Sequence, residues 1–191
     1  VSDIDAASGN MRVTLSVTNG TLAANTSVSG GVPSAGITGN GTGSVVLVGT
    51  LAQINATLAN STGVTFSPSS NFNGNVTLTM LTNDQGNTGS GGSLTDTDTR
   101  TIVVNAVNDA PVATNDSFTT SEDTSGTTTV LSNDSDIDGN TLTITQVNGI
   151  SIVAGGAAIS VTNGTVSLNA AGTQLTFTPS SNYNGPASYT Y

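Results

Sequence analysis

The sequence predicts an all-β protein built from two tandem β-sandwich modules, with one short helix in the first. Apolar residues alternate with Thr or Ser in many short runs, as at Val13, Leu15 and Val17, which is the period of a half-buried strand. Asn-Gly pairs, which favour tight turns, separate these runs. Several stretches also occur twice along the chain, as expected for two copies of one fold.

The expected strands follow from the period of two. The alternating runs are residues 13–17, 76–80, 142–144, 166–168, 175–177 and 189–191. Many short strands separated by turns are typical of a sandwich or barrel. Residues 50–60 are the exception, because Leu51, Ile54 and Leu58 have helical spacing. The short helix is therefore predicted there.

Three repeated motifs define the two copies. SDID occurs at 2–5 and 135–138, SVTNGT at 16–21 and 160–165, and TFSPSSNFNG at 65–74 returns as TFTPSSNYNG at 176–185. The unequal offsets indicate an insertion in the first copy, which we assign to residues 22–61. Pro111 interrupts the strand pattern between the copies. The predicted domains are therefore residues 1–107 and 108–191.

Each copy also lacks one edge strand in this alignment. The first copy begins at its SDID motif, without a counterpart of the run 112–119. The second ends before a counterpart of the run 100–107. Two explanations are open at this point: the chain is a piece of a longer protein, or neighbouring subunits supply the missing strands by β-strand addition.

Composition narrows the classes of function. The chain has twelve acids, two arginines, no lysine, no histidine and no cysteine, with a net charge of −10. Such an acidic chain is a poor partner for nucleic acid. The common catalytic bases and nucleophiles are missing, so we expect no enzyme. No apolar run approaches the roughly 18 residues of a membrane helix, so we expect no membrane insertion.

The acidic stretch 133–140 is the strongest candidate for a binding site. Asp134, Asp136 and Asp138 alternate and are followed by Gly139, a pattern that presents several hard oxygens to one Ca²⁺ ion. An EF-hand is excluded, because Thr145 stands where that loop has a bidentate Glu. The flanking segments 130–132 and 141–145 are also predicted to be strands rather than helices.

The order of motifs around this stretch carries a family resemblance. VNDAP at 107–111 is followed by SFTTSEDTSGTTTV at 117–130 and LSNDSDIDGNTLTI at 131–144. This order resembles the cadherin-like tandem repeats of large bacterial surface adhesins. The resemblance implies cadherin/immunoglobulin-like Greek-key sandwiches, an extracellular location at the cell surface, and calcium at the junctions between modules.

The resemblance also implies a set of calcium ligands. They are Asn105, Asn108 and Asp109 in the linker, Asp134, Asp136 and Asp138 in the second module, Asp3, Asp5 and Asp84 at the far end of the first, and Glu122 at the far end of the second. Asn105 departs from the family, which has an acid there. Asp96 and Asp98 are expected in a loop before a strand, where an Asp is more often a turn former.

The sequence therefore predicts a calcium-stiffened structural spacer of an extracellular adhesin or surface filament. Its partners would be neighbouring repeat modules of the same protein or filament. One alternative is a filament subunit that polymerises by β-strand complementation. Another is an adhesion module that binds a host or cell-surface glycan or protein, for example through the insertion 22–61.

Overall fold

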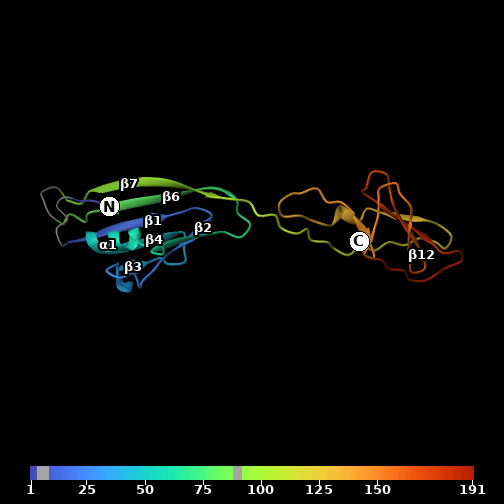
Figure 1. Ribbon diagram of the computed structural model, residues 1–191, viewed down its shortest axis with the longest axis horizontal. Helices are drawn as coiled ribbons and strands as arrows, with labels where there is room; N and C mark the ends of the chain where they lie inside the picture. Colours follow the sequence, from blue (N-terminus) through green and yellow to red (C-terminus); the bar gives the residue numbers. More distant parts are fainter. Residues whose placement is uncertain (4–8, 88–91) are drawn as a thin grey trace. The chain divides into compact units, whose positions relative to one another are not determined.

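The computed structural model describes residues 1–3, 9–87 and 92–191, which form two compact units (Figure 1). Unit 1 comprises Val1–Val107 and unit 2 comprises Asn108–Tyr191. Each unit consists of antiparallel strands around its own apolar core, as the alternating pattern predicts. None of the helices in the described part of the chain has the length and apolar character that a membrane span needs.

Unit 1 contains two sheets and one α-helix. Its elements are β1 (Asn10–Ser16), β2 (Gly20–Ala24), a 3-10 turn (Ser34–Gly36), β3 (Ile37–Thr38), β4 (Ser44–Thr50), α1 (Leu51–Ala59), β5 (Val64–Pro68), β6 (Gly74–Asn83) and β7 (Thr95–Val104). The larger sheet has the order β3-β4-β1-β6-β7, and β2 pairs with β5 in the smaller one. The chain therefore leaves the larger sheet after β1 and returns to it on both sides of that strand.

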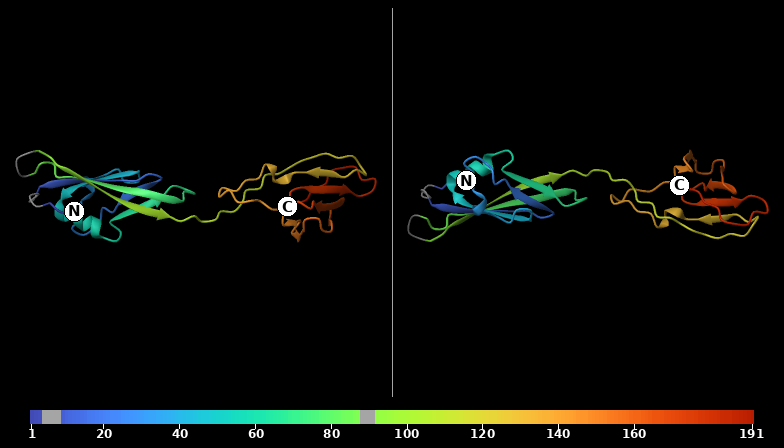
Figure 2. Two further views of the ribbon diagram at one scale, coloured as in Figure 1. Left: turned by 90° about the horizontal axis from the view of Figure 1, so that it is seen from above. Right: turned by 90° about the horizontal axis from the view of Figure 1, so that it is seen from below.

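The core of unit 1 lies between these layers. Met11, Val13 and Leu15 are buried along one face of β1, because alternate strand residues share a face. Helix α1 and the β2–β5 pair cover this face (Figure 2), and Ile54 and Leu22 enter the same core from them.

Helix α1 confirms the helix predicted from the spacing of Leu51, Ile54 and Leu58. Its start is fixed by a capping box. The Thr50 hydroxyl accepts a hydrogen bond from the Gln53 amide (3.3 Å), and the Gln53 side chain accepts one from the Thr50 amide (3.0 Å). The last turn anchors the inserted segment, because the buried Thr57 hydroxyl accepts a hydrogen bond from the Val32 amide (2.9 Å).

Unit 2 has shorter strands. They are β8 (Gly126–Thr128), β9 (Gln146–Val147), β10 (Ile150–Ser151), β11 (Ile159–Val161), β12 (Gly164–Leu168) and β13 (Leu175–Pro179), with a 3-10 turn at Val130–Ser132. The main sheet has the order β11-β12-β13-β8, and β9 pairs with β10. Val130, Val166, Leu175 and Phe177 belong to one buried cluster.

The repeated motifs build the same strand pair in both units. In unit 1, β2 and β5 place Gly20 opposite Pro68 and Leu22 opposite Phe66. In unit 2, β12 and β13 pair in the matching register, because SVTNGT and the TF-x-PSSN-x-NG motif occupy matching positions. Equivalent turn residues also share left-handed backbone angles, as at Asn71 (φ 58°) and Asn182 (φ 56°). Asparagine tolerates this conformation better than most residues.

Several strand predictions for unit 2 are wrong. Residues 130–132 form a 3-10 turn that buries Val130, and no strand covers 141–145. Along 112–119 the pairing is limited to one bridge, between Val112 and Ser135. Residues 189–191 are not a strand either, because Thr190 bonds to the Asn148 turn: the Thr190 amide donates to the Asn148 side chain at 2.8 Å. One backbone bond and one side-chain bond between Asn148 and Thr190 thus stand in place of a regular ladder.

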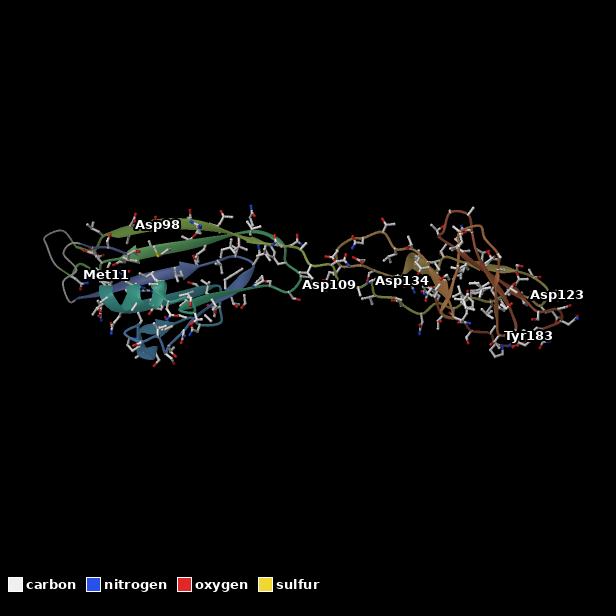
Figure 3. All side chains as sticks on the ribbon, in the orientation of Figure 1. Met11, Asp98, Asp109, Asp123, Asp134 and Tyr183 are labelled. Atoms are coloured by element: carbon white, nitrogen blue, oxygen red, sulfur yellow. The ribbon has the colours of Figure 1, made fainter. Side chains whose placement is uncertain are left out.

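Asp96 and Asp98 lie within β7 and not in the predicted loop. They stand opposite Thr82 and Met80 on β6, and both are exposed on the outer strand of the sheet. Figure 3 shows Asp98 on this strand. Charged side chains on an outer strand discourage pairing with further chains. Asp98 shares its face with Met80, and both line one groove of unit 1, so this carboxylate lies at the margin of the inner face of the sheet.

Candidate metal centre

The acidic stretch of unit 2 forms a tight turn. The Asp136 carboxylate accepts hydrogen bonds from the amides of Asp138 (2.8 Å) and Asn140 (3.3 Å). Gly139 has a left-handed backbone (φ 73°), and its amide donates to the Asp136 carbonyl at 3.1 Å. A glycine is suited to this position because it has no Cβ to clash there.

The start of unit 2 lies along this turn. The Asp138 carboxylate accepts a hydrogen bond from the Asp109 amide (2.7 Å), and the Asn140 amide group donates to the Asn108 side-chain oxygen (2.8 Å). Further along, the Asp134 carboxylate accepts a bond from the Thr114 amide at 2.8 Å. The structure thus places the segment of Asn108 and Asp109 beside the turn of Asp136 and Asp138, whereas Asp134 bonds further along, to Thr114.

A hollow of about 470 Å³ lies beside these segments within unit 2. Its wall includes side chains whose carboxylate or amide oxygens could bind a cation, namely those of Asn108, Asp109, Asp134, Asp136 and Asn140. Carboxylate and amide oxygens are the ligands that Ca²⁺ prefers. The chemistry of the donors therefore fits calcium.

The number of carboxylates that come together is small. In the described ranges 1–3, 9–87 and 92–191, no three acidic side chains lie close enough to one another to hold a metal ion. In each of Asp134, Asp136 and Asp138, one carboxylate oxygen also accepts a hydrogen bond from a backbone amide of the same unit. Since Ca²⁺ takes about 6–8 oxygens, carbonyl groups and water would have to supply much of its shell here.

The four predicted calcium ligands of unit 1 are Asp3, Asp5, Asp84 and Asn105. Asp5 lies outside the described residues. Asp3 is partly buried, and Asn105 is exposed just after β7. The Asp84 carboxylate accepts bonds from the amides of Gly86 (2.9 Å) and Leu94 (2.7 Å), so it shapes the loop between β6 and β7.

At the other end of unit 2, Asp123, the neighbour of the predicted ligand Glu122, makes a contact within the unit. Glu122 is exposed in a turn. The Asp123 carboxylate accepts a hydrogen bond from the Asn182 amide (2.8 Å), and Figure 3 places Asp123 and Tyr183 at the end opposite Asp109. The signal for this contact is weak in the sequence, because the two partners are far apart along the chain.

Tyr191 and Asp116 are a second pair that the sequence did not single out. The Tyr191 hydroxyl donates to the Asp116 carboxylate at 2.8 Å and lies 3.5 Å from an oxygen of Asp134. Burial, followed by the hydrogen bond and charge of Asp116, raises the pKa of Tyr191 above its usual value. The phenol therefore stays protonated beside the two carboxylates.

The geometry defines unit 2 as an antiparallel β-unit with hydrogen-bonded acidic turns at its ends. Residues 108–191 match the family model of the bacterial Ig domain, so this part of the chain is a bacterial immunoglobulin-like domain. The match begins where unit 2 begins. No curated protein and no solved structure matches the chain.

Proposed function

We propose that this chain is a structural spacer in an extracellular bacterial surface protein made of cadherin-like or Ig-like repeats. The observation that carries the proposal is the strand pair that recurs in the same register, as β2–β5 in unit 1 and β12–β13 in the bacterial Ig-like unit 2. Bacterial Ig domains usually occur in surface or secreted proteins.

The chemistry of the chain supports a passive role over catalysis. The matched family is not a catalytic one. The chain has no histidine, cysteine or lysine, and most of the acids that the structure describes lie in turns and loops or on an outer strand. In such places carboxylates accept backbone hydrogen bonds or face water, and neither arrangement activates a nucleophile.

Calcium is the second part of the proposal. At most two carboxylates of the acidic turn, such as Asp136 and Asp138, would hold the ion in unit 2, together with the Asn108 side-chain oxygen, backbone carbonyls and water. A divalent ion would offset the mutual repulsion of carboxylates in a chain with only two arginines. The ordered turn would then gain stability by mass action, because the ion binds the folded unit and not the unfolded one.

The test is thermal unfolding of the full chain in EDTA and in 10 mM calcium. Extracellular calcium modules have a Kd of about 10⁻⁴–10⁻³ M, so this concentration would stabilise unit 2 by roughly 1.4–2.7 kcal/mol. The double variant Asp136→Asn/Asp138→Asn keeps the oxygen acceptors but removes the charges, and it should lose the effect. Asp96→Asn/Asp98→Asn is the matched control on β7 and should keep it. Equal melting with and without calcium would remove calcium from the proposal.

The spacer role has its own test. Antibodies against the chain should label intact cells of the source bacterium, and labelling that requires permeabilisation would contradict a surface location. A glycan array probed with the full chain should give no specific signal. A reproducible glycan ligand would instead favour the adhesion-module alternative.

A further inference from the structure

The larger sheet of unit 1 has an outward face that runs across all five strands. Side chains of a strand alternate between two faces, so the residues between the buried Met11, Val13 and Leu15 of β1 point away from the core. The strand register continues this face into the neighbouring strands. Its central row takes one residue each from β3, β4, β1, β6 and β7, namely Thr38, Val46, Thr14, Leu81 and Thr97.

Part of this outward face is apolar. Strand β4 has apolar side chains on both faces, which is typical of a strand that is covered on both sides. Val45 and Leu47 are 0% exposed in the core, whereas Val46 and Val48 point away from it. Leu81 stands opposite Thr14 and is 39% exposed. The elements that pack on this sheet, α1 and the β2–β5 pair, lie on its other face, so the apolar groups of the outward face favour a partner.

The charge of the outward face differs from that of the whole chain, which has twelve acids, two arginines and a net charge of −10. The acids of the five strands are Asp96 and Asp98, and both alternate with the outward residues of β7. Within these strands, the charged residue on the outward face is Arg12, and the other outward positions carry Thr, Ser, Asn, Val or Leu. A second acidic chain can therefore approach this face without bringing carboxylates together, which would be unfavourable.

We propose that this face binds the same face of a second copy of the chain. The two faces pack as one sheet on another, about 10 Å apart, and the Val46, Val48 and Leu81 side chains of each copy are covered by the other. Five strands span about 20 Å, and seven residues along a strand span about 23 Å, so the pair of faces buries roughly 1,000 Å². This area lies at the lower end of specific interfaces, so the association between free chains is weak. The contact goes beyond the proposed spacer function and does not depend on it.

The experiment is sedimentation equilibrium of the full chain in EDTA, at concentrations up to about 1 mM. We expect a monomer–dimer equilibrium that strengthens in high salt, because salt screens the repulsion between two chains of net charge −10. Leu81→Asp places a carboxylate at the centre of each face and should raise the dimer Kd at least about tenfold. The matched control is Ile150→Asp in unit 2, which adds the same charge at an apolar residue that is 55% exposed. Its Kd should stay close to that of the unsubstituted chain.

A second variant and a second measurement locate the contact. Thr97→Asp changes an exposed residue of the same row, so it should weaken the dimer even if Leu81→Asp does not fold. Amide NMR shifts that change on dilution should lie in β1, β4, β6 and β7 and not in β12 or β13.

Three results would overturn the proposal. They are a chain that stays monomeric at the highest concentration in high salt, a dimer Kd that Thr97→Asp raises no more than Ile150→Asp, and dilution shifts centred on another surface. None of these results bears on calcium or on where the protein resides, so the spacer proposal is judged separately.

Discussion

Phe177 lies against Gly164 on the neighbouring strand, so closely that a Cβ on Gly164 would fall 2.7 Å from Cε2 of the ring. Phe66 lies in the same way against Gly20 in unit 1, where a Cβ would also fall 2.6 Å from the Ser67 carbonyl oxygen. The glycine after the asparagine in each SVTNGT motif thus makes room for an aromatic ring as well as a turn. This pair explains why the two motifs recur together in both units.

Replacing these glycines by alanine should destabilise each unit. In Gly164→Ala the methyl group would meet both the ring of Phe177 and the Thr178 carbonyl, so we expect a loss of about 1–3 kcal/mol from overpacking. Gly20→Ala should cost less, because the partly buried Phe66 has more room to move. Gly43→Ala is the control, since its Cβ meets nothing closer than 3.2 Å. Denaturant unfolding measures all three variants, and an equal loss for Gly43→Ala would contradict the explanation.

Replacing Phe177 and Phe66 by alanine should show how much the deeper burial of Phe177 adds to the stability of its unit. Phe177→Ala removes a side chain that is 6% exposed and should cost unit 2 about 3–5 kcal/mol. Phe66→Ala removes its partly buried counterpart and should cost unit 1 less than about 3 kcal/mol. Thermal unfolding followed by NMR assigns each loss to its unit. Equal losses would mean that β8 adds little to the burial of Phe177.

Thr57 should be essential for anchoring the segment between β2 and β5. Its hydroxyl accepts from the Val32 amide and donates to the Gln53 carbonyl at 3.1 Å. Thr57→Val keeps the shape but leaves a buried donor without a partner, which costs about 1–3 kcal/mol. Thr57→Ser keeps the hydroxyl and should retain most of the stability. The comparison is made by denaturant unfolding, and a similar loss in both variants would point to packing of the methyl group instead.

The stability of unit 2 should fall in alkaline solution. The ring of Tyr189 stacks on Phe177 with centroids 6.3 Å apart, and burial, followed by the charge of Asp116, raises the Tyr189 pKa above its usual 10.0. The unfolded chain releases this proton near pH 10 and the folded one holds it longer. Stability is therefore complete below pH 10 and declines as the pH rises beyond it.

Two variants test this alkaline decline in calcium-free buffer. Tyr189→Phe keeps the stacked ring but cannot ionise, so the decline above pH 10 should become shallower. Asp116→Asn removes a charge that raises the pKa of both Tyr189 and Tyr191, so it should also make the decline shallower, through both phenols. The measurement is the free energy of unfolding of unit 2 between pH 8 and pH 11. An unchanged profile in Tyr189→Phe would assign the alkaline loss to other groups.

Local patterns were sufficient for the elements that depend on near neighbours. The period of two at Val13, Leu15 and Val17 predicted β1, and helical spacing with a Thr50–Gln53 cap accounts for α1. These patterns act within a few residues along the chain, where propensity and capping decide the conformation. The same logic failed at residues 130–132, because burial of Val130 in a 3-10 turn is decided by distant residues of the core.

The sequence by itself determined the two repeats, the turns that punctuate them and the acidic composition, because each is a property of neighbouring residues. Only the tertiary structure decided that Asp138 bonds to the Asp109 amide, that Asp123 contacts Asn182, and that β8 pairs with β13. These contacts join segments far apart in the chain. Their pairing depends on the summed burial of a whole unit, which no local pattern encodes.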